Sequence, residues 1–187
     1  MSFDGVDDFV SSAGGTSLDN LSSMTISAWI NPKSYGSDNL AVIIGKGLIN
    51  GWILNLNNVD VTGGIEFYRH YSTTNLSAVS VADTITLNQW QHVTVTWNGS
   101  ANRSGVAFSV NGIPVARNTG VGTDGSGTHD DSSNVDYYIG ADCTQPAEID
   151  CNSGVLQFMF KGLIDDVRIY NHVLSKDEIK RLYNMGR

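Results

Sequence analysis

The sequence has few basic residues and no cluster of them. Its 187 residues include 11 Lys or Arg against 19 Asp or Glu, which gives a net charge of −8. Proteins that bind nucleic acids or anionic membranes carry patches of basic side chains. The lack of such a patch argues against both kinds of partner and leaves a neutral molecule, a cation or a metal ion.

The sequence also lacks a long apolar segment. No run approaches the roughly 18 apolar residues that a membrane span needs. Met1 leads directly into a strand-like pattern, without the regions of a signal peptide. We therefore expect no membrane insertion. The even composition predicts a single domain over residues 1–187, which we interpret as a module of a longer protein that carries the targeting signal elsewhere.

Common catalytic motifs are missing as well. There is no Gly-x-Ser-x-Gly, no His-Glu-x-x-His and no Gly-rich phosphate-binding loop. Of the four histidines, His92 lies in the strand-like segment WQHVTVTW, where a structural histidine is the usual case. His129 precedes two aspartates, and there a solvated loop is favoured over a metal site.

The sequence does contain a series of short β-branched and aromatic segments, separated by Gly, Asn, Asp and Ser. This pattern is typical of an antiparallel β-sandwich. The segments predict strands at 3–10, 24–31, 41–45, 51–56, 64–70, 91–97, 105–110, 113–117, 136–140, 155–160 and 163–170.

Two local signals are more specific than the strands. Asn111 and Gly112, between VAFSV and IPVAR, predict a tight hairpin because both residues accept positive φ angles. Ser175 followed by Glu178 is a capping box, and apolar residues then recur at helical spacing. We therefore expect one short C-terminal helix. Residues 120–134, almost without apolar side chains, predict a long surface loop.

Acidic residues interrupt two of the expected strands. FDGVDDFV at the start contains Asp4, and GLIDDVRIY near the end contains Asp165. Terminal strands of a sandwich commonly pair, and carboxylates that meet repel each other unless a cation lies between them. Ca²⁺ takes several hard oxygen ligands, and Gly5 allows a close approach of the backbone. We predict a calcium site at Asp4, Gly5 and Asp165; turn formation is the alternative for the neighbouring aspartates.

Eight segments follow one another in a specific order: FDGVDDFV, LSSMTISAWINP, VIIGKG, GWILNL, QWQHVTVTWNGS, VNGIPVA, YYIGA and KGLIDDVRIYNHVLSKDEIKRLYN. Together they resemble the laminin G-like domains of the concanavalin A-like lectin/glucanase superfamily. The resemblance implies an all-β jelly roll of two antiparallel sheets. It also implies an extracellular module, commonly attached to enzymes or adhesins that handle polysaccharide.

The resemblance further implies the ligands of a structural calcium ion. Asp165, in DDVRIY, corresponds to the aspartate that holds the ion together with main-chain oxygens near the first strand. Asp4 is the matching acidic residue of the opening strand. Gly5 and Gly45 are the main-chain oxygen donors that we consider.

Membership of this superfamily does not by itself make the chain an enzyme. Its sandwich glucanases use paired carboxylates at alternate positions of one strand. Of the three glutamates here, Glu178 belongs to the helix cap. Neither Glu66 nor Glu148 has an acidic residue two or four positions away within a strand. We therefore predict a noncatalytic protein, with an unrecognised active site as the minor alternative.

The two cysteines, Cys143 and Cys151, frame the segment TQPAEID. A metal site would need further Cys or His residues at ligand spacing, and the sequence has none there. In an exported module we expect the two to form a disulfide. Two reduced thiols in a cytosolic protein are the alternative.

Aromatic residues determine where a sugar could stack. All four tryptophans, at 29, 52, 90 and 97, lie in strand-like segments, and we expect them in the core. In GIEFYRHY, alternation separates the apolar Ile65 and Phe67 from Glu66, Tyr68 and His70. We predict that these last three form a ligand-binding surface.

These observations predict a noncatalytic carbohydrate-binding module with a structural calcium ion, in a secreted or cell-surface protein. Its partner would be a poly- or oligosaccharide, along with other domains of the parent protein. A protein-binding or structural spacer domain of an adhesin is the alternative.

Overall fold

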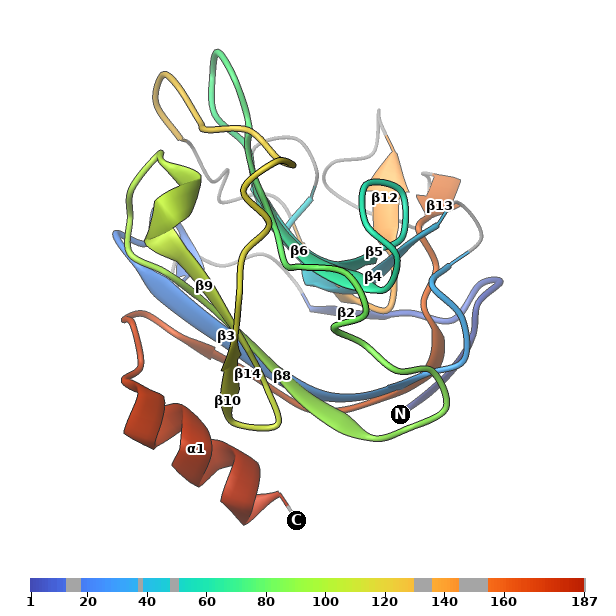
Figure 1. The fold of residues 1–187 in the computed structure, drawn as a ribbon. Helices are drawn as coiled ribbons and strands as arrows, with labels where there is room; N and C mark the ends of the chain where they lie inside the picture. The colour runs from blue at the N-terminus through green and yellow to red at the C-terminus, as the bar shows by residue number, and fades with distance from the viewer. Residues whose placement is uncertain (13–17, 37–38, 48–50, 130–135, 145–154, 187) are drawn as a thin grey trace.

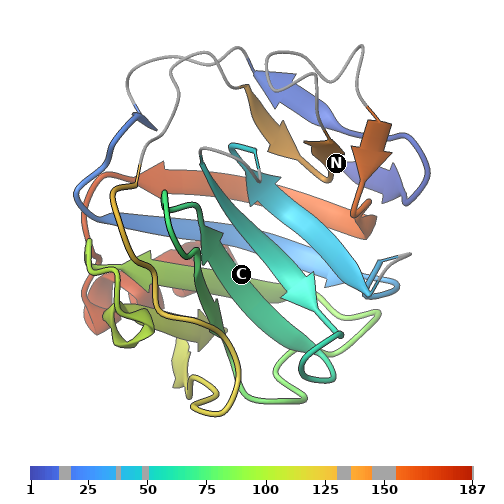
Figure 2. The same ribbon diagram turned by 90° about the horizontal axis from the view of Figure 1, so that it is seen from above.

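The protein is a sandwich of two antiparallel six-stranded sheets with one helix at the C-terminal end (Figure 1). The computed structural model describes residues 1–12, 18–36, 39–47, 51–129, 136–144 and 155–186. The two sheets face each other, and β4, β5 and β6 lie over the strands of the other sheet in Figure 2. The predicted fold class is confirmed.

The first sheet has the strand order β1-β14-β3-β8-β9-β10. Its strands are β1 (Ser2–Asp4), β14 (Lys161–Tyr170), β3 (Met24–Pro32), β8 (Gln91–Trp97), β9 (Val106–Val110) and β10 (Ile113–Val115). The C-terminal helix α1 (Lys176–Met185) lies on the outer side of this sheet (Figure 1).

The second sheet has the strand order β2-β11-β4-β5-β6-β7. Its strands are β2 (Val10–Ser12), β11 (Tyr137–Ile139), β4 (Leu40–Gly45), β5 (Trp52–Asn57), β6 (Gly64–Arg69) and β7 (Leu76–Val79). A separate ribbon pairs β12 (Asp142–Thr144) with β13 (Val155–Gln157), and a short 3₁₀ turn, η2 (Arg103–Gly105), precedes β9.

The core fills the space between the sheets with alternate residues of each strand. On β5, Trp52, Leu54 and Leu56 are buried there, and on β8, Trp97 packs 6.4 Å from the ring of Phe67. Trp52 and Trp97 therefore lie in the core, as expected. The expectation was wrong for the other two tryptophans, because Trp29 has the outward parity of β3 and is half-buried, and Trp90 is 44% exposed.

The hairpin and the helix cap are both confirmed. Asn111 and Gly112 have φ angles of 53° and 73° between β9 and β10. The hydroxyl of Ser175 accepts a hydrogen bond from the backbone of Glu178, whose side chain in turn accepts one from the Ser175 backbone. Tyr183 of the helix stacks on Trp29, with the ring centroids 5.6 Å apart, and this contact holds the helix against the first sheet.

The opening segment is not one strand, as its apolar pattern predicted. β1 belongs to the first sheet and β2 to the second, and a turn joins them. In that turn, the Asp4 carboxylate accepts a hydrogen bond of 2.7 Å from the amide of Val6, and Gly5 has a φ angle of 83°. An aspartate that binds the backbone two residues ahead favours a turn over a strand.

The two aspartates of GLIDDVRIY lie at a β-bulge in β14. The pairing with β3 shifts register between Asp165 and Arg168, and Asp166 has a φ angle of 48°, a conformation that aspartate tolerates better than most residues. The bulge turns both carboxylates to the outer face of the first sheet, where they line a pocket.

Three other strands also differ from those that the sequence predicted. The strand expected at 155–160 stops at Gln157, because Phe158 has a φ angle of 54°. Neither β7 nor β12 was predicted; both are shorter than five residues. In the described part of the expected loop, Thr123 and Ser126 form isolated bridges with the segment around β7.

An ion pair is buried at the end of β4. The side chain of Lys46 is fully buried and bonds to Asp19, whose side chain is 10% exposed. The ammonium group also lies 5.5 Å from the centre of the Tyr137 ring. Within the described residues, no helix is long and apolar enough to cross a membrane.

The buried ion pair predicts an asymmetric mutational response. Asp19→Asn leaves the Lys46 charge buried without its counter-ion, so it should destabilise the protein by about 3 kcal/mol. The double variant Asp19→Asn/Lys46→Met removes both charges and should be more stable than Asp19→Asn alone. Urea unfolding of the three proteins measures this. An Asp19→Asn protein as stable as the wild type would contradict the assignment.

Candidate functional site

A groove of about 280 Å³ lies on the outer face of the second sheet. Its polar side chains come from β5, the turn after it and β6: Asn55, Asn57, Asp60 and Glu66. The rings of Tyr68 and Phe158 also line it, and apolar side chains complete the walls: Leu40, Val42, Ile53 and Val59. Apolar walls with a few polar groups that converge are typical of a ligand site.

Glu66 is the centre of the polar network. Its Oε2 accepts hydrogen bonds from the amide groups of Asn55, at 3.2 Å, and Asn57, at 2.9 Å. Its Oε1 accepts one of 2.6 Å from the hydroxyl of Ser77 on β7. One carboxylate therefore joins the outer faces of three neighbouring strands and fixes the polar side chains of the groove.

The predicted alternation of β6 is confirmed. Ile65 and Phe67 are buried in the core, whereas Glu66 and Tyr68 are half-buried on the outer face. Burial first, and then the negative charges of Glu66 and Asp142, raises the pKa of Tyr68. The phenol therefore stays protonated at neutral pH. Its oxygen accepts a hydrogen bond from the side chain of Asn75.

His70, the third residue of the predicted surface, is half-buried beyond the end of β6. It is not among the described residues that line the groove. The structure thus brings Glu66 and Tyr68 together in one site and leaves His70 outside it.

Phe158 is a groove residue that the sequence did not reveal. It adopts a φ angle of 54°, which is unfavourable for a bulky aromatic residue. Its carbonyl oxygen accepts a hydrogen bond of 2.9 Å from the amide of Val42 on β4. Strained backbone of this kind persists where the surrounding structure enforces it, and it is common at ligand sites.

Asp60 is the second residue that sequence reasoning missed. The amide nitrogen of Asn57 donates both to Glu66 Oε2, at 2.9 Å, and to Asp60 Oδ2, at 3.1 Å. Because each oxygen is about 3 Å from the same nitrogen, the two oxygens are at most about 6 Å apart. A search for carboxylates within one strand could not find this pair, since Asp60 lies in the turn between β5 and β6.

The structure does not bring Asp4 and Asp165 together. Asp4 of β1 pairs with Lys161 of β14, whereas Asp165 lies four residues further along β14, where it pairs with Trp29. Four residues span about 13 Å along a strand. The carboxylate oxygens of Asp4, Asp7 and Asp8 instead lie within 4.8 Å of one another, and all three residues are exposed. Gly5 lies within this turn, whereas Gly45 ends β4 in the other sheet.

The aspartate turn fits calcium in its ligand type. Calcium prefers carboxylate oxygens in flexible, irregular geometry. Part of the capacity is already used, because Asp4 Oδ1 accepts the amide of Val6 and Asp8 Oδ2 accepts the amide of Asp4 at 2.9 Å. A calcium site therefore stays a prediction.

The predicted disulfide lies outside the described residues. Cys151 is not among them, and of Cys143 only the backbone is described, in β12. Asp130 and Asp131, next to His129, also lie outside them. The Nδ1 atom of His129 itself lies 2.8 Å from the guanidinium of Arg69.

His92 is a structural histidine, as expected. It is 2% exposed, and its ring lies 5.4 Å from Trp29 and 6.3 Å from Tyr183. Burial lowers the pKa of His92 to about 4. Smaller effects come from Asp166, which raises the pKa, and from Arg168, which lowers it. The imidazole is therefore neutral at neutral pH.

Comparison with known sequences places the chain in a family. A laminin G profile, described as the concanavalin A-like lectin/glucanases superfamily, matches residues 4–180. The chain therefore belongs to the concanavalin A-like lectin/glucanase superfamily, in its laminin G-like branch. No curated protein matches it.

Solved structures share the fold. A protein of Bacteroides ovatus described as carbohydrate-binding is 20% identical over 94% of this chain and 44% of its own, with a TM-score of 0.61. Domain 4 of the Geobacillus stearothermophilus arabinanase AbnA, solved with arabinotriose, is 17% identical over 97% of this chain and 75% of its own, with a TM-score of 0.61. The SAP-like pentraxin of Limulus polyphemus is 18% identical over 95% of this chain and 83% of its own, with a TM-score of 0.58. The chain thus spans less than half of the first protein. At these identities the likeness shows the fold.

Calcium binding is testable by separating the two groups of carboxylates. If calcium binds the aspartate turn, EDTA should lower the melting temperature of the wild type and added calcium should restore it. Asp4→Asn should abolish this response, and Asp165→Asn should retain it. The opposite pattern in differential scanning calorimetry would instead support Asp165 as the ligand, and no response in any protein would exclude the site.

The burial of His92 predicts a pH dependence. The folded-state pKa of about 4 lies below the ordinary 6.5, so the unfolded chain binds the proton more readily between these values. This contribution to stability is complete above pH 6.5 and is lost as the pH falls towards 4, by about 3 kcal/mol at most. His92→Gln should show a correspondingly flatter decline in the free energy of unfolding. Equal slopes for both proteins would contradict a neutral His92.

Proposed function

We propose that this protein is a noncatalytic carbohydrate-binding module and that its glycan site is the groove of Tyr68, Phe158 and Glu66. The carrying observation is the combination in one groove of two aromatic rings with amide and carboxylate groups that Glu66 holds in place. Sugars present both apolar faces and hydroxyl edges, and this groove offers partners for each.

The groove chemistry favours a neutral glycan. Its charged residues are Asp60 and Glu66, and among the described residues that line it none is basic. An anionic sugar would be repelled by these carboxylates. Hydroxyl groups, in contrast, can donate to the carboxylates of Asp60 and Glu66.

Relatives in the superfamily support the proposal. Domain 4 of AbnA belongs to an extracellular arabinanase and was solved with arabinotriose, and the Bacteroides ovatus protein is described as carbohydrate-binding. By analogy, the chain acts as a module of a larger secreted or cell-surface protein. The structural calcium ion and the Cys143–Cys151 disulfide belong to the same proposal, since both are common in exported modules.

Glycoside hydrolysis is a second candidate, and one observation favours it. Glu66 and Asp60 present carboxylate oxygens at most about 6 Å apart, a range that includes the roughly 5–5.5 Å between the two carboxyl groups of retaining glycosidases. Against it, both oxygens of Glu66 already accept hydrogen bonds from three side chains. A general acid must instead present a proton to the leaving group.

Glycan binding through Tyr68 is the test. Calorimetry against neutral plant, algal and microbial polysaccharides should give weak binding to at least one of them. Tyr68→Ala should lower the affinity about fivefold, because a ring contact contributes about 1 kcal/mol. Tyr68→Phe should keep most of it. His70→Ala, just beyond the end of the same strand and outside the groove, is the control and should bind as the wild type does.

Three outcomes would change the assignment. Release of reducing sugars, abolished by Glu66→Gln, would establish hydrolysis. An unchanged affinity in Tyr68→Ala, with an intact fold by circular dichroism, would exclude this groove. No binding to any glycan would favour the protein-binding or spacer alternative.

A further inference from the structure

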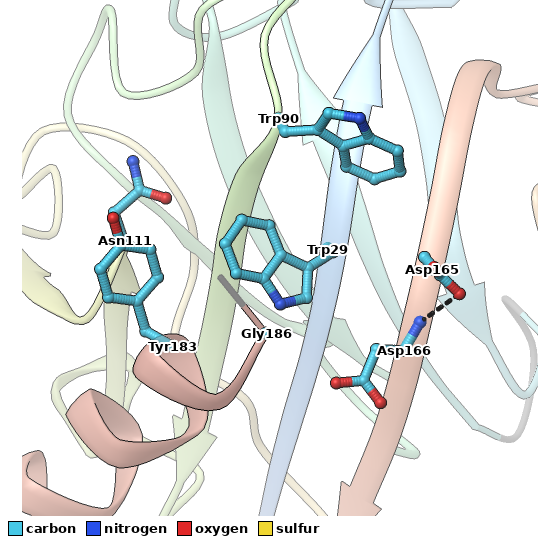
Figure 3. A pocket seen from close by; sticks show the side chains of 7 residues that line it. All are labelled: Trp29, Trp90, Asn111, Asp165, Asp166, Tyr183 and Gly186. Atoms are coloured by element: carbon cyan, nitrogen blue, oxygen red, sulfur yellow. Dashed lines mark hydrogen bonds between the residues drawn. The ribbon is translucent and has the colours of Figure 1, made fainter.

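A second and larger pocket, of about 770 Å³, lies on the opposite side of the protein, on the outer face of the first sheet (Figure 3). It is bounded by β3, by the bulge of β14 and by the end of α1. Figure 3 shows Trp29 in the middle with Trp90 above it, the two aspartates of β14 on one side and Tyr183 and Asn111 on the other. The volume falls within the usual range of small-molecule sites, about 300–1,000 Å³.

Aromatic rings form one side of the pocket. Trp90 precedes β8 and is 44% exposed, which is unusual for the largest apolar side chain. Trp29 is held in place by its stacking with Tyr183 and by contact with the buried ring of His92, its partner on the neighbouring strand β8. The helix thus fixes the position of one indole, and the second remains accessible to a ligand.

Carboxylates lie beside Trp29 on the neighbouring strand, since Asp165 of β14 pairs with Trp29 of β3. Asp165 Oδ1 accepts a hydrogen bond of 2.9 Å from the backbone amide of Asp166, and Asp166 Oδ1 accepts one of 2.8 Å from Nε of Arg168. Arg168 therefore compensates one of the two negative charges. Among the described residues that line the pocket, none is Lys or Arg.

Indole rings beside carboxylates attract one kind of ligand. The negative face of an indole ring favours a cation, and the attraction grows as the contact is desolvated. The remaining carboxylate charge acts in the same direction, and so does the protein's net charge of −8. An anion is disfavoured by the same carboxylate charge.

We propose that the pocket between Trp29, Trp90 and the Asp165–Asp166 bulge binds a small organic cation with an ammonium or quaternary ammonium group. The methyl or methylene groups next to the nitrogen contact the indole rings, and the positive charge faces the carboxylates. An alkylammonium compound and a protonated amino sugar share this chemistry. The site is separate from the glycan groove, since the two lie on the outer faces of different sheets.

The test compares choline with its neutral isostere 3,3-dimethyl-1-butanol, by calorimetry and by NMR of the indole NH groups. Choline should saturate the site and bind about tenfold more tightly than the alcohol. Glucosamine against glucose tests the amino sugar in the same way. Trp90→Ala should lower the affinity for choline about fivefold, and Asp165→Asn/Asp166→Asn about tenfold. Trp90→Phe should lose less than Trp90→Ala.

Each control separates this proposal from others. Tyr68→Ala should leave choline binding intact, and Trp90→Ala should leave glycan binding intact, so the two sites succeed or fail independently. Equal binding of choline and the neutral alcohol would show an apolar pocket without preference for charge. Competition of calcium with choline would show a metal site at Asp165. Either result, or no binding of choline and glucosamine in the folded wild type, would overturn the proposal.

Discussion

The interaction on which the site depends is the set of hydrogen bonds that converge on Glu66. Asn55 and Asn57 lie on the outward parity of β5 and yet are only 5% and 1% exposed. A buried amide without a partner costs free energy, so the face of the sheet needs an acceptor. Glu66 supplies it for both and also binds Ser77. This network turns an ordinary sheet surface into a rigid, polar floor beside two aromatic rings.

Much of the architecture follows from patterns in the sequence. Alternation predicted the inward residues of β6, the Asn-Gly pair predicted the hairpin, and the capping box predicted where the helix begins. These signals are local, because each depends on residues within one turn or one strand. The order of the eight quoted segments then indicated the jelly-roll fold in which the strands are connected.

The positions that were missed depend on positive φ angles or on the tertiary fold. Phe158 and Asp166 adopt left-handed conformations that their residue types seldom indicate, and each ends or shifts a strand pairing at a ligand-sized cavity. Asp60 meets Glu66 only because a turn returns it to the sheet. Trp90 lies in a strand-like segment, and its exposure results from its place just before β8 rather than within it. Alternation within strands predicted Glu66 and Tyr68, two of the ten described residues that line the groove, and none of these four residues.

The central claim is that a neutral glycan binds at the groove without cleavage. The most direct measurement is a titration of the ¹⁵N-labelled protein with a neutral oligosaccharide, followed by backbone and side-chain amide shifts together with the anomeric signals of the sugar. The account predicts that shifts concentrate on the side-chain amides of Asn55 and Asn57 and on the backbone around Tyr68 and Phe158, while the anomeric signals persist. Shifts confined to other surfaces, or new anomeric signals from cleaved sugar, would contradict it.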